Sequence, residues 1–575
     1  MVLSAPIKDH TNAIRARLNK HATDTHQQIK ELQVCVSTGK LQGSPNAGGV
    51  RNEWRSTALV DDRVTSPLRR TNYLTPYAFS QKLQKKFGAA ANDSAINTLT
   101  HLSPHATAKH LFSGRQLLWC ILSVATLVTG LSLATTETII FLNAIATLFL
   151  VATIGFRLYL TLSVAGHTAS SSEQETCADA DLPSITILLP LYRETKSLPS
   201  LAEAILSLDY PRHKLDPKLI FEEDDIETLQ EAKRLELEKW FDFIIVPQGK
   251  PKTKPKACNY ALAFARGDLT VIYDAEDAPE ADQLRKAATA FAKGPEDLIC
   301  LQAKLNYYNK DENWLTRLFS LEYALWFDNL LPALHELRTP IPLGGTSNIF
   351  ITTKLKEIGG WDPYNVTEDA DLGLRIARRG YRVGLLDSTT FEEANCRTPN
   401  WIRQRSRWMK GYLQTWLVYM RDTPNKKYSH SLRDMLSVHL FIGGTVFSAL
   451  INPILWMIFL FWLFSQSPDI SQYFPEPLMV LNLFALLFGN SFFIYLAMIA
   501  PLKRGWPELS TSAFLAPIYW WLLSFAAYKA LLQLFIRPWH WEKTDHGLSD
   551  VAMKRSQIAL SKIRYTDQLD VTGER

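Results

Sequence analysis

Long apolar runs divide the chain into membrane-like and soluble parts. Two runs, 117–134 and 139–160, lie close together after a polar N-terminal segment, and three more, 435–463, 478–501 and 511–536, lie near the C-terminus. A helix needs about 20 apolar residues to cross the hydrocarbon core of a bilayer. The pattern therefore predicts a multi-pass membrane protein with a soluble stretch between the two groups.

The first two runs predict a transmembrane hairpin over residues 114–162. Their connector is short and lacks a basic residue, whereas Arg115 precedes the pair and Arg157 closes it. Basic residues concentrate in the cytoplasmic loops of membrane proteins. We therefore expect both ends of the hairpin in the cytoplasm.

For the C-terminal apolar region, 435–541, the question is whether the chain crosses the membrane an odd or an even number of times. Three crossings there would leave the basic polar tail, 542–575, on the far side of the membrane, against the positive-inside bias. We expect either a re-entrant break near Asn452-Pro453 or an interfacial ending for the last run.

Between the two groups, residues 181–421 alternate strand and helix patterns. The runs SITILLPLY, KLIFEEDD, FDFIIVPQ and LTVIYDAED are typical of buried strands, with helical patterns between them. Such alternation predicts a parallel sheet covered on both faces. Open α/β sheets bind ligands at the carboxyl ends of their strands, so the site should lie there.

Residues 1–113 predict a basic polar arm on the cytoplasmic side. The first 115 residues contain 16 Lys or Arg and 7 Asp or Glu, while the whole chain has a formal charge of only +5. We expect a flexible solvated segment. The alternative is attraction to anionic lipid headgroups.

The composition excludes several other classes. A mean hydropathy of −0.07 hides the apolar runs, and 28 Phe, 20 Tyr and 16 Trp exclude a disordered or fibrous chain. Six scattered cysteines without a Cys-x-x-Cys pair argue against a disulfide framework or a zinc site. The N-terminus has no apolar stretch of the kind found in cleaved signal peptides.

Two acidic clusters follow predicted strands. Asp274, Glu276 and Asp277 lie just beyond the fourth strand, where carboxylates can hold Mg²⁺ or Mn²⁺ against a diphosphate. The cluster 222–225 follows the second strand, and its mutual repulsion would be relieved by a cation or a ligand's N–H donors. The alternatives are a solvated acidic turn and helix N-terminal acids.

Three further motifs offer candidate chemistry. Lysines at 254 and 256 precede or open a helix, a place suited to phosphate, although an exposed loop lysine is the ordinary alternative. Thr367-Glu368-Asp369 starts another helix, so it can be a simple cap or can supply a general base. The amphipathic helix predicted over 400–416 places Trp401, Gln404, Arg405 and Trp408 on one face, suited to sugar stacking or to membrane anchoring.

Taken together in this order, the motifs from Asp181 to Arg421 resemble the membrane-embedded family-2 glycosyltransferases, the group containing bacterial cellulose, chitin and hyaluronan synthases. Within that group the sequence is similar to the cellulose-synthase-like branch that makes exopolysaccharide. The resemblance implies a GT-A-type, Rossmann-like parallel-sheet α/β domain inserted between transmembrane helices. It does not cover residues 1–100, and the tail is too short for a cyclic-di-GMP-binding domain.

The resemblance also implies roles for individual residues. Thr367-Glu368-Asp369 matches the family's catalytic triplet, which makes Asp369 the base with Glu368 beside it, and the family's Asp-x-Asp falls on Asp274-Ala275-Glu276, so that Asp274, Glu276 and Asp277 are the implied metal ligands. The implied nucleotide-sugar contacts are Pro190, Tyr192, Glu194, Glu223, Asp224, Lys256, Asn259, Asp274 and Arg407. The family's Gln-x-x-Arg-Trp signature implies an acceptor or channel entrance at Gln404, Arg405 and Trp408.

The implied function is an inverting, metal-dependent hexosyltransferase of the bacterial inner membrane with a cytoplasmic catalytic domain. It would polymerise a nucleotide sugar, UDP-glucose first, into a β-glucan or other exopolysaccharide and pass it across the bilayer. Its partners would be the donor, the growing chain, lipid and export proteins of the periplasm or outer membrane, with no nucleic acid. One alternative is single addition to a lipid carrier, and another is a non-catalytic transporter or scaffold. A Rossmann dehydrogenase is disfavoured because no Gly-x-Gly-x-x-Gly follows the first strand.

Overall fold

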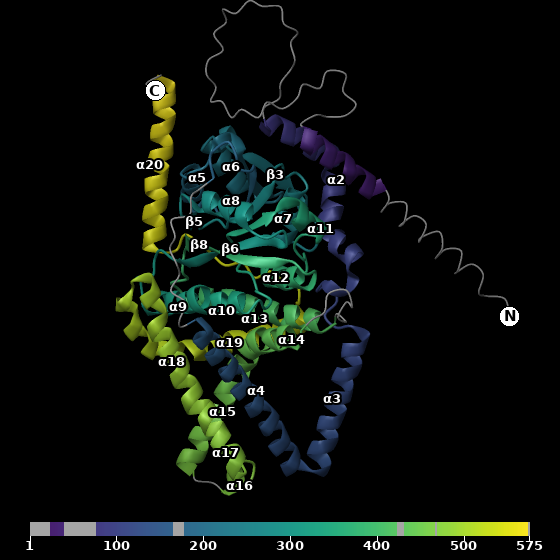
Figure 1. Ribbon diagram of the computed structural model, residues 1–575, viewed down its shortest axis with the longest axis vertical. Helices are drawn as coiled ribbons and strands as arrows, with labels where there is room; N and C mark the ends of the chain where they lie inside the picture. The colour runs from purple at the N-terminus through teal and green to yellow at the C-terminus, as the bar shows by residue number, and fades with distance from the viewer. Residues whose placement is uncertain (1–23, 39–75, 165–176, 422–430, 466–467, 573–575) are drawn as a thin grey trace, which may run out of the picture.

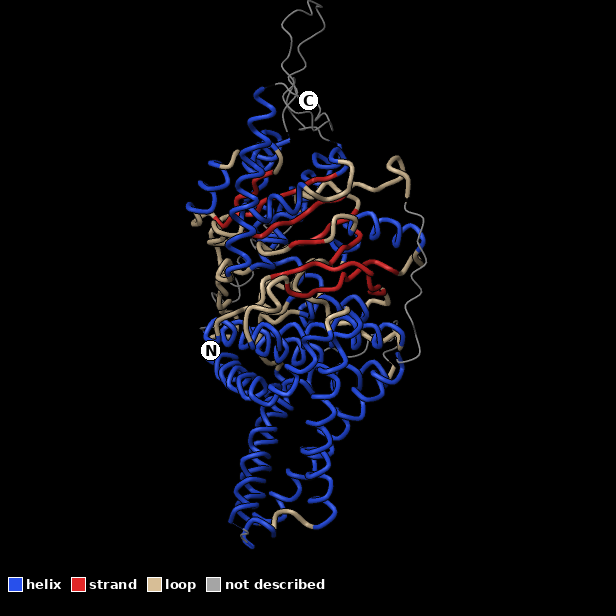
Figure 2. The backbone as a smooth tube through the Cα atoms, turned by 90° about the vertical axis from the view of Figure 1, so that its left-hand side faces the viewer, coloured by secondary structure: helices blue, strands red, loops and turns tan. Residues whose placement is uncertain are grey.

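An eight-stranded sheet in the order β3-β2-β1-β4-β7-β6-β8-β5 forms the centre of the soluble part. The computed structural model describes residues 24–38, 76–164, 177–421, 431–465 and 468–572. Figure 2 shows the strands above a layer of helices, from which a helix bundle descends. Of the arm expected over 1–113, residues 1–23 and 39–75 lie outside the described residues.

The first half of the sheet is parallel, as the sequence pattern predicts. It consists of β1 (Ile185–Leu191), β2 (Leu215–Glu222), β3 (Asp242–Val246) and β4 (Leu269–Ile272). Successive side chains of a strand point to opposite faces of its sheet. Residues 185, 187 and 189 of β1 accordingly join one apolar core, and Leu188 joins the other. Two covered faces explain why the strand is a continuous apolar run.

The second half makes the sheet mixed rather than wholly parallel. β7 (Asn348–Ile351) pairs antiparallel with both β4 and β6 (Leu298–Tyr307). β6 pairs parallel with β8 (Arg382–Glu392), which pairs antiparallel with the short β5 (Ala278–Pro279). The α/β domain between apolar helices is therefore confirmed, and the predicted parallel pairing holds for β1 to β4 but not for the second half of the sheet.

Helices cover both faces of the sheet, and further helices form the layer beneath it (Figure 1). Those of the sheet domain are α5 (Leu198–Leu206), α6 (Ile226–Arg234), α7 (Lys254–Leu262), α8 (Gln283–Lys293), α11 (Thr352–Glu357) and α12 (Glu368–Arg378). Those of the layer beneath are α9 (Trp314–Leu325), α10 (Leu331–Glu336), α13 (Thr398–Arg421), α14 (Leu432–Val438) and α19 (Ala516–Ile536). α20 (Asp550–Thr572) packs along α5.

The part of the N-terminal segment that the structure describes from residue 76 onward is folded. Helix α2 (Pro76–Leu102) buries Phe79, Leu83 and Phe87 in the core shared with α7. Helix 24–38 adds Leu32 and neighbouring residues to the same core. The expectation of a flexible arm is therefore wrong over α2, because this helix covers the open side of β3.

A glutamine of α2 completes the hydrogen bonding of that edge strand. Gln84 Nε2 donates to the carbonyl of Phe243 at 2.9 Å, and Gln84 Oε1 accepts from the backbone N–H of Ile245 at 2.9 Å. Gln81 donates to the same carbonyl at 3.0 Å. An edge strand exposes unpaired N–H and C=O groups that invite pairing with another chain. The side-chain amide of Gln84 thus makes the two hydrogen bonds that one residue of a neighbouring strand would otherwise make.

Within the described residues, five helices are long and apolar enough to cross a membrane. These candidates span Gly114–Leu133, Thr135–Ser163, Leu432–Ser465, Glu476–Arg504 and Pro507–Ile536. The first two are α3 (Gly114–Leu133) and α4 (Thr135–Val164), and the others include α15 (Gly444–Ser465), α17 (Glu476–Leu483), α18 (Gly489–Ile499) and α19. Their length and composition support the expected membrane association.

We predict that Gln84→Leu loosens the edge of the sheet. The nearly isosteric leucine leaves the Phe243 carbonyl and the Ile245 N–H without partners, so local opening should become easier. Hydrogen–deuterium exchange of a peptide containing Ile245 should accelerate by about tenfold. Lys82→Leu, at an exposed position of the same helix, is the control and should leave the exchange unchanged. Equal exchange in both variants would contradict the role of Gln84.

Candidate active site

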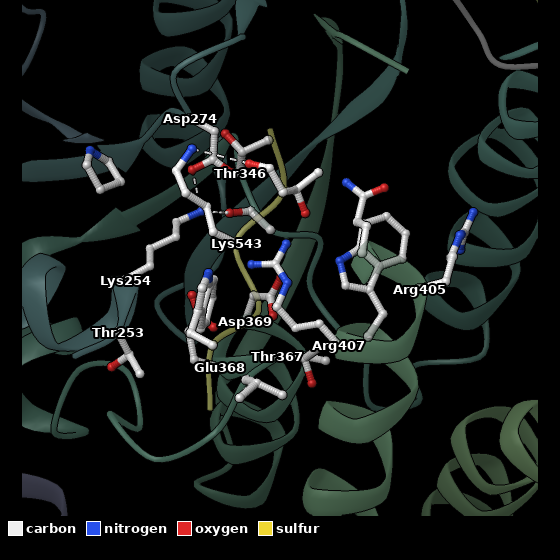
Figure 3. Close-up of a pocket in the computed structure, with 18 of the residues that line it drawn as sticks. Thr253, Lys254, Asp274, Thr346, Thr367, Glu368, Asp369, Arg405, Arg407 and Lys543 are labelled. Carbon is white, nitrogen blue, oxygen red and sulfur yellow. Dashed lines mark hydrogen bonds and ion pairs between the residues drawn. The ribbon is translucent and has the colours of Figure 1, made fainter. Parts of the chain in front are cut away.

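A cavity of about 910 Å³ lies between the carboxyl ends of the parallel strands and the helix layer. Its wall includes the segment after β1, the turn after β4, the start of α12, one face of α13 and the chain between α19 and α20. Figure 3 shows Asp274 from the turn after β4, Glu368 and Asp369 from the start of α12, and Arg407 from α13 converging on it. The cavity thus occupies the position where open α/β sheets bind ligands.

Two carboxylates of the turn after β4 line the cavity, and a third lies outside its lining. Asp274 and Glu276 line the cavity, whereas Asp277 does not. Asp277 Oδ2 accepts from the backbone N–H of Asp274 at 2.7 Å and from the hydroxyl of Thr346. Asp277 therefore stabilises the turn. It does not face the cavity, contrary to the expectation that it would be a metal ligand beside Asp274 and Glu276.

Two cations from distant segments face these carboxylates. Lys254 forms an ion pair with Asp274 and donates to the carbonyl of Gly345 at 2.8 Å. Burial opposes its charge, but Asp274 and Glu368 outweigh burial and hold the pKa of Lys254 above its usual value. His546 Nδ1 lies 3.0 Å from Glu276 Oε1. Burial lowers the pKa of His546, but Glu276, Glu194 and Glu393 together outweigh burial and raise it to about 9.

The start of α12 places a second acidic pair beside the first. Burial, with the neighbouring charge of Asp369, raises the pKa of Glu368 to about 8. Burial also raises the pKa of Asp369, although Lys254 opposes that shift. Asp369 Oδ1 is buried and has no hydrogen-bond partner among the described residues. It is therefore free to accept a proton from a bound molecule.

Close packing of α13 against this turn fixes the pair in place. A Cβ atom at Gly411 would approach the side chain of Thr367 within 2.3 Å, so only glycine lets the two elements meet here. The helix begins after Thr367 as its sequence predicts, but the Thr367 side chain makes no cap hydrogen bond. The cap explanation therefore does not account for the triplet.

Residues of the Gln404–Trp408 motif contact both the cavity and the helix layer. Arg407 faces the two acidic pairs and lies 4.3 Å over the ring of Trp541, and burial lowers its pKa. Arg405 instead forms a two-pronged pair with Glu322 at 2.9 and 2.5 Å. Trp408 stacks near Tyr323 with ring centroids 6.2 Å apart. The motif therefore both lines the cavity and ties α13 to α9.

The segment 537–549, here called the strap, was not predicted from the sequence. It crosses the cavity between α19 and α20, with Lys543 bound to Glu194 at 2.8 Å and His546 bound to Glu276. Buried Glu393 anchors its end by accepting the backbone N–H groups of residues 547, 548 and 549. Its sequence, RPWHWEKTDHGLS, is a polar and aromatic run directly after an apolar block. That abrupt change was the available signal.

The cavity brings together most, but not all, of the sequence-predicted residues. Those that line it are Pro190, Tyr192, Glu194, Asp274, Glu276, Glu368, Asp369, Gln404, Arg405, Arg407 and Trp408. Those outside its lining are Glu223, Asp224, Lys256, Asn259 and Asp277.

Each of the other four residues outside the lining has a local partner. Lys256 donates to the carbonyl of Pro247 at 2.6 Å, and Asn259 bonds the backbone of Trp361. Asp224 pairs with Lys252 at 2.6 Å, and Glu223 accepts the N–H of residue 248. Glu222, Lys254 and Glu392 line the cavity in their stead.

Sequence comparison identifies the domain to which part of this chain corresponds. Residues 269–524 match the family described as "Glycosyl transferase family group 2". The "Probable glycosyltransferase YdaM" of Bacillus subtilis (strain 168) is 23% identical over 277 residues, which cover 47% of this chain. The match spans 65% of that relative's own length, which is less than two thirds.

Structural comparison finds more distant likenesses. The mannosyltransferase PcManGT from Pyrobaculum calidifontis, solved in complex with GDP-Man and Mn²⁺, is 17% identical, with a TM-score of 0.42 over 70% of this chain and 99% of the other. Residues 1–349 of S. aureus TarS are 14% identical, with a TM-score of 0.31 over 60% of this chain and 91% of the other.

We predict a graded loosening of the strap when Glu393 is replaced. Glu393→Gln keeps one acceptor oxygen for the three N–H groups, whereas Glu393→Ala keeps none, so buried donors are left unpaired. Amide exchange of a peptide covering 543–549 should be slowest in the wild type, faster in Glu393→Gln and fastest in Glu393→Ala, the last by at least about tenfold. Identical exchange in all three proteins would show that the carboxylate does not anchor the strap.

Proposed function

We propose that this family-2 glycosyltransferase domain transfers a sugar from a nucleoside diphosphate to an acceptor hydroxyl with inversion at the anomeric carbon. The carrying observation is Asp369, a carboxylate with a buried, unpartnered Oδ1, in the lining of a large cavity that also holds Lys254 and Arg407. A general base needs an accessible lone pair, and a leaving diphosphate needs nearby cations. Both requirements meet in one cavity.

The residues divide the reaction between them. Asp369 accepts the proton of the acceptor hydroxyl, whose oxygen forms a bond to the anomeric carbon while the bond from that carbon to the diphosphate oxygen breaks. Attack opposite the leaving group inverts the linkage, so an α-linked donor gives a β-linked product. Arg407 and Lys254 stabilise the charge that develops on the departing diphosphate. The elevated pKa of Asp369 suits proton acceptance better than that of an ordinary exposed aspartate.

The acids after β4 fit a divalent cation shared with the donor. Asp274 and Glu276 both face the cavity, and each already holds one cationic side chain. Among the residues that the structure describes, no three His, Cys, Asp or Glu side chains form a closed metal site. Mg²⁺ and Mn²⁺ commonly take one or two carboxylates plus substrate phosphates. When bound, such an ion would help to neutralise the diphosphate.

For the substrates, we propose UDP-glucose as the first donor to test and a growing β-glucan as the product. The Gln404–Trp408 motif, with its aromatic surroundings at the cavity, supports an acceptor site for sugar rings. The competing proposal is single addition to a lipid carrier, supported by the apolar helices that reach the same cavity. Product length on a gel, measured over a panel of UDP- and GDP-sugars, separates the two.

We predict that Asp369→Asn abolishes transfer without unfolding the protein. The amide preserves shape but cannot take the hydroxyl proton, so activity should fall by about 10²–10⁴-fold. Transfer from radiolabelled donor in purified membranes is the measurement. Asp387→Asn, at a carboxylate that is 79% exposed, is the matched control and should retain activity. Polymer or single-sugar product at wild-type yield in Asp369→Asn would refute the base assignment.

We also predict opposite effects of Asp274 and Lys254 on cation affinity. Without nucleotide, Asp274→Asn removes a ligand and should weaken Mn²⁺ binding, whereas Lys254→Met removes a competing cation and should strengthen it. Shifts of about tenfold in each direction are expected, read from the electron paramagnetic resonance signal of free Mn²⁺. Asp387→Asn again serves as the control. Parallel shifts in both variants would contradict this arrangement.

A further inference from the structure

An arginine of α4 lies behind the cavity wall at Thr445 and forms no ion pair with a carboxylate among the described residues. Arg157 Nη2 donates to the hydroxyl of Thr445 at 2.7 Å, and Thr445 lines the cavity. Its guanidinium also lies over the rings of Phe441 and Phe493, at 5.8 and 5.3 Å. Arg157 Nε is buried and has no hydrogen-bond partner among the described residues. A buried cation left in this state favours an anionic ligand.

The carboxylate that interacts electrostatically with Arg157 is already hydrogen-bonded to other side chains. Glu322 interacts electrostatically with Arg157, but its two oxygens receive Arg405 at 2.9 and 2.5 Å. Tyr519 adds a further hydrogen bond to Glu322 at 2.5 Å. Two arginines thus share one acid, which leaves a net positive charge at this end of the cavity.

The depth of Arg157 corresponds to the level of lipid headgroups. It lies 22 residues after Thr135, the first residue of α4, which is about 33 Å of helix. Thr445 lies 20 residues before Ser465 in α15, or about 30 Å. The hydrocarbon core of a bilayer is about 30 Å thick. For helices that cross the bilayer from those ends, this pair therefore lies near the opposite surface, where the lipid phosphates are.

The surroundings suit an amphiphile rather than a free ion. Tyr412, Leu523 and Ile536 also line the cavity, and they come from α13 and from the apolar helix α19. Below them, α3 diverges from α4 away from their short connector (Figure 1), and none of its residues is buried. Exposed apolar side chains such as Leu142 and Ile145 of α4 would contact acyl chains directly.

We propose that the acceptor is a membrane lipid with a phosphate in its headgroup, held by Arg157, which Thr445 positions, so that a headgroup hydroxyl reaches Asp369. This rests on the proposed function and names its acceptor class. The hydroxyl oxygen forms the new bond to the anomeric carbon, its proton passes to Asp369, and the nucleoside diphosphate leaves. A growing glycan attached to such a lipid would use the same anchor.

The test compares three probes that separate charge from membrane anchoring. Phosphatidylglycerol has a phosphate, hydroxyls and acyl chains; diacylglycerol lacks the phosphate; and glycerophosphoglycerol lacks the chains. Native mass spectrometry of the full chain in detergent should show retention of phosphatidylglycerol over diacylglycerol by at least about tenfold, as expected for charge-assisted hydrogen bonds. Arg157→Gln should abolish this preference and Arg157→Lys should keep most of it. Arg115→Gln, at an exposed arginine near the start of α3, should behave as wild type.

The outcomes are decisive in either direction. A phosphatidylglycerol preference that persists in Arg157→Gln overturns the proposal, as does equal binding of glycerophosphoglycerol, which would indicate a free anion site. If Arg157→Gln does not fold, Thr445→Val should still reduce the preference, and an unchanged preference there also overturns it. Failure of the proposed function looks different, because the wild type would then release no nucleoside diphosphate from any donor while lipid retention was still measurable.

Discussion

The structure depends on balancing several carboxylates within one largely buried cavity. Asp274, Glu276, Glu368 and Asp369 face the same space, and burial favours their neutral forms. The compensating charges come from far apart in the chain: Lys254 at the start of α7, and beyond it α13 and the strap. Since unpaired buried charge is costly, this balance requires that all these segments be assembled together.

Helix α13 connects the cavity to the apolar helices through its hydrogen bonds. Lys410 donates to the carbonyl of His540 at 2.8 Å, which holds the strap, while Arg405 ties the helix to Glu322. At its end, Arg421 bonds Gln116 at 3.0 Å, next to the start of α3. The cavity and the apolar helices are therefore connected through one helix.

The sequence predicted the parallel half of the sheet well because strands buried on both faces leave a clear signal. It missed α2, whose buried positions include small residues such as Ser80, Ala91 and Ala95 that give a weak apolar signal. It also missed β8, whose run RVGLLDSTTFE includes exposed and partly exposed positions that weaken its apolar signal.

At the site, the sequence located the motifs but not the directions of their side chains. Lys254 and Lys256 are two residues apart on one helix, so they point to different faces, and only Lys254 reaches the cavity. Asp277 belongs to the acidic cluster, yet a turn hydrogen bond withdraws it from the cavity. The strap could not be placed at all, because only the tertiary fold returns it over residues that precede it by hundreds of positions.

The position of α20 bears on the number of membrane crossings, which hydropathy alone leaves open. α20 packs on α5 and α2 packs on β3 and α7, so the chain is on the sheet side both before and after the apolar helices. Only an even number of the three C-terminal candidates can then cross. Figure 1 shows α19 lying beside α13 in the layer under the sheet, across the direction in which α15 and α17 descend. This arrangement favours α19 as an interfacial helix and α15 with the α17–α18 segment as a second hairpin. With α3 and α4, we therefore expect four crossings that begin and end on the side of the cavity.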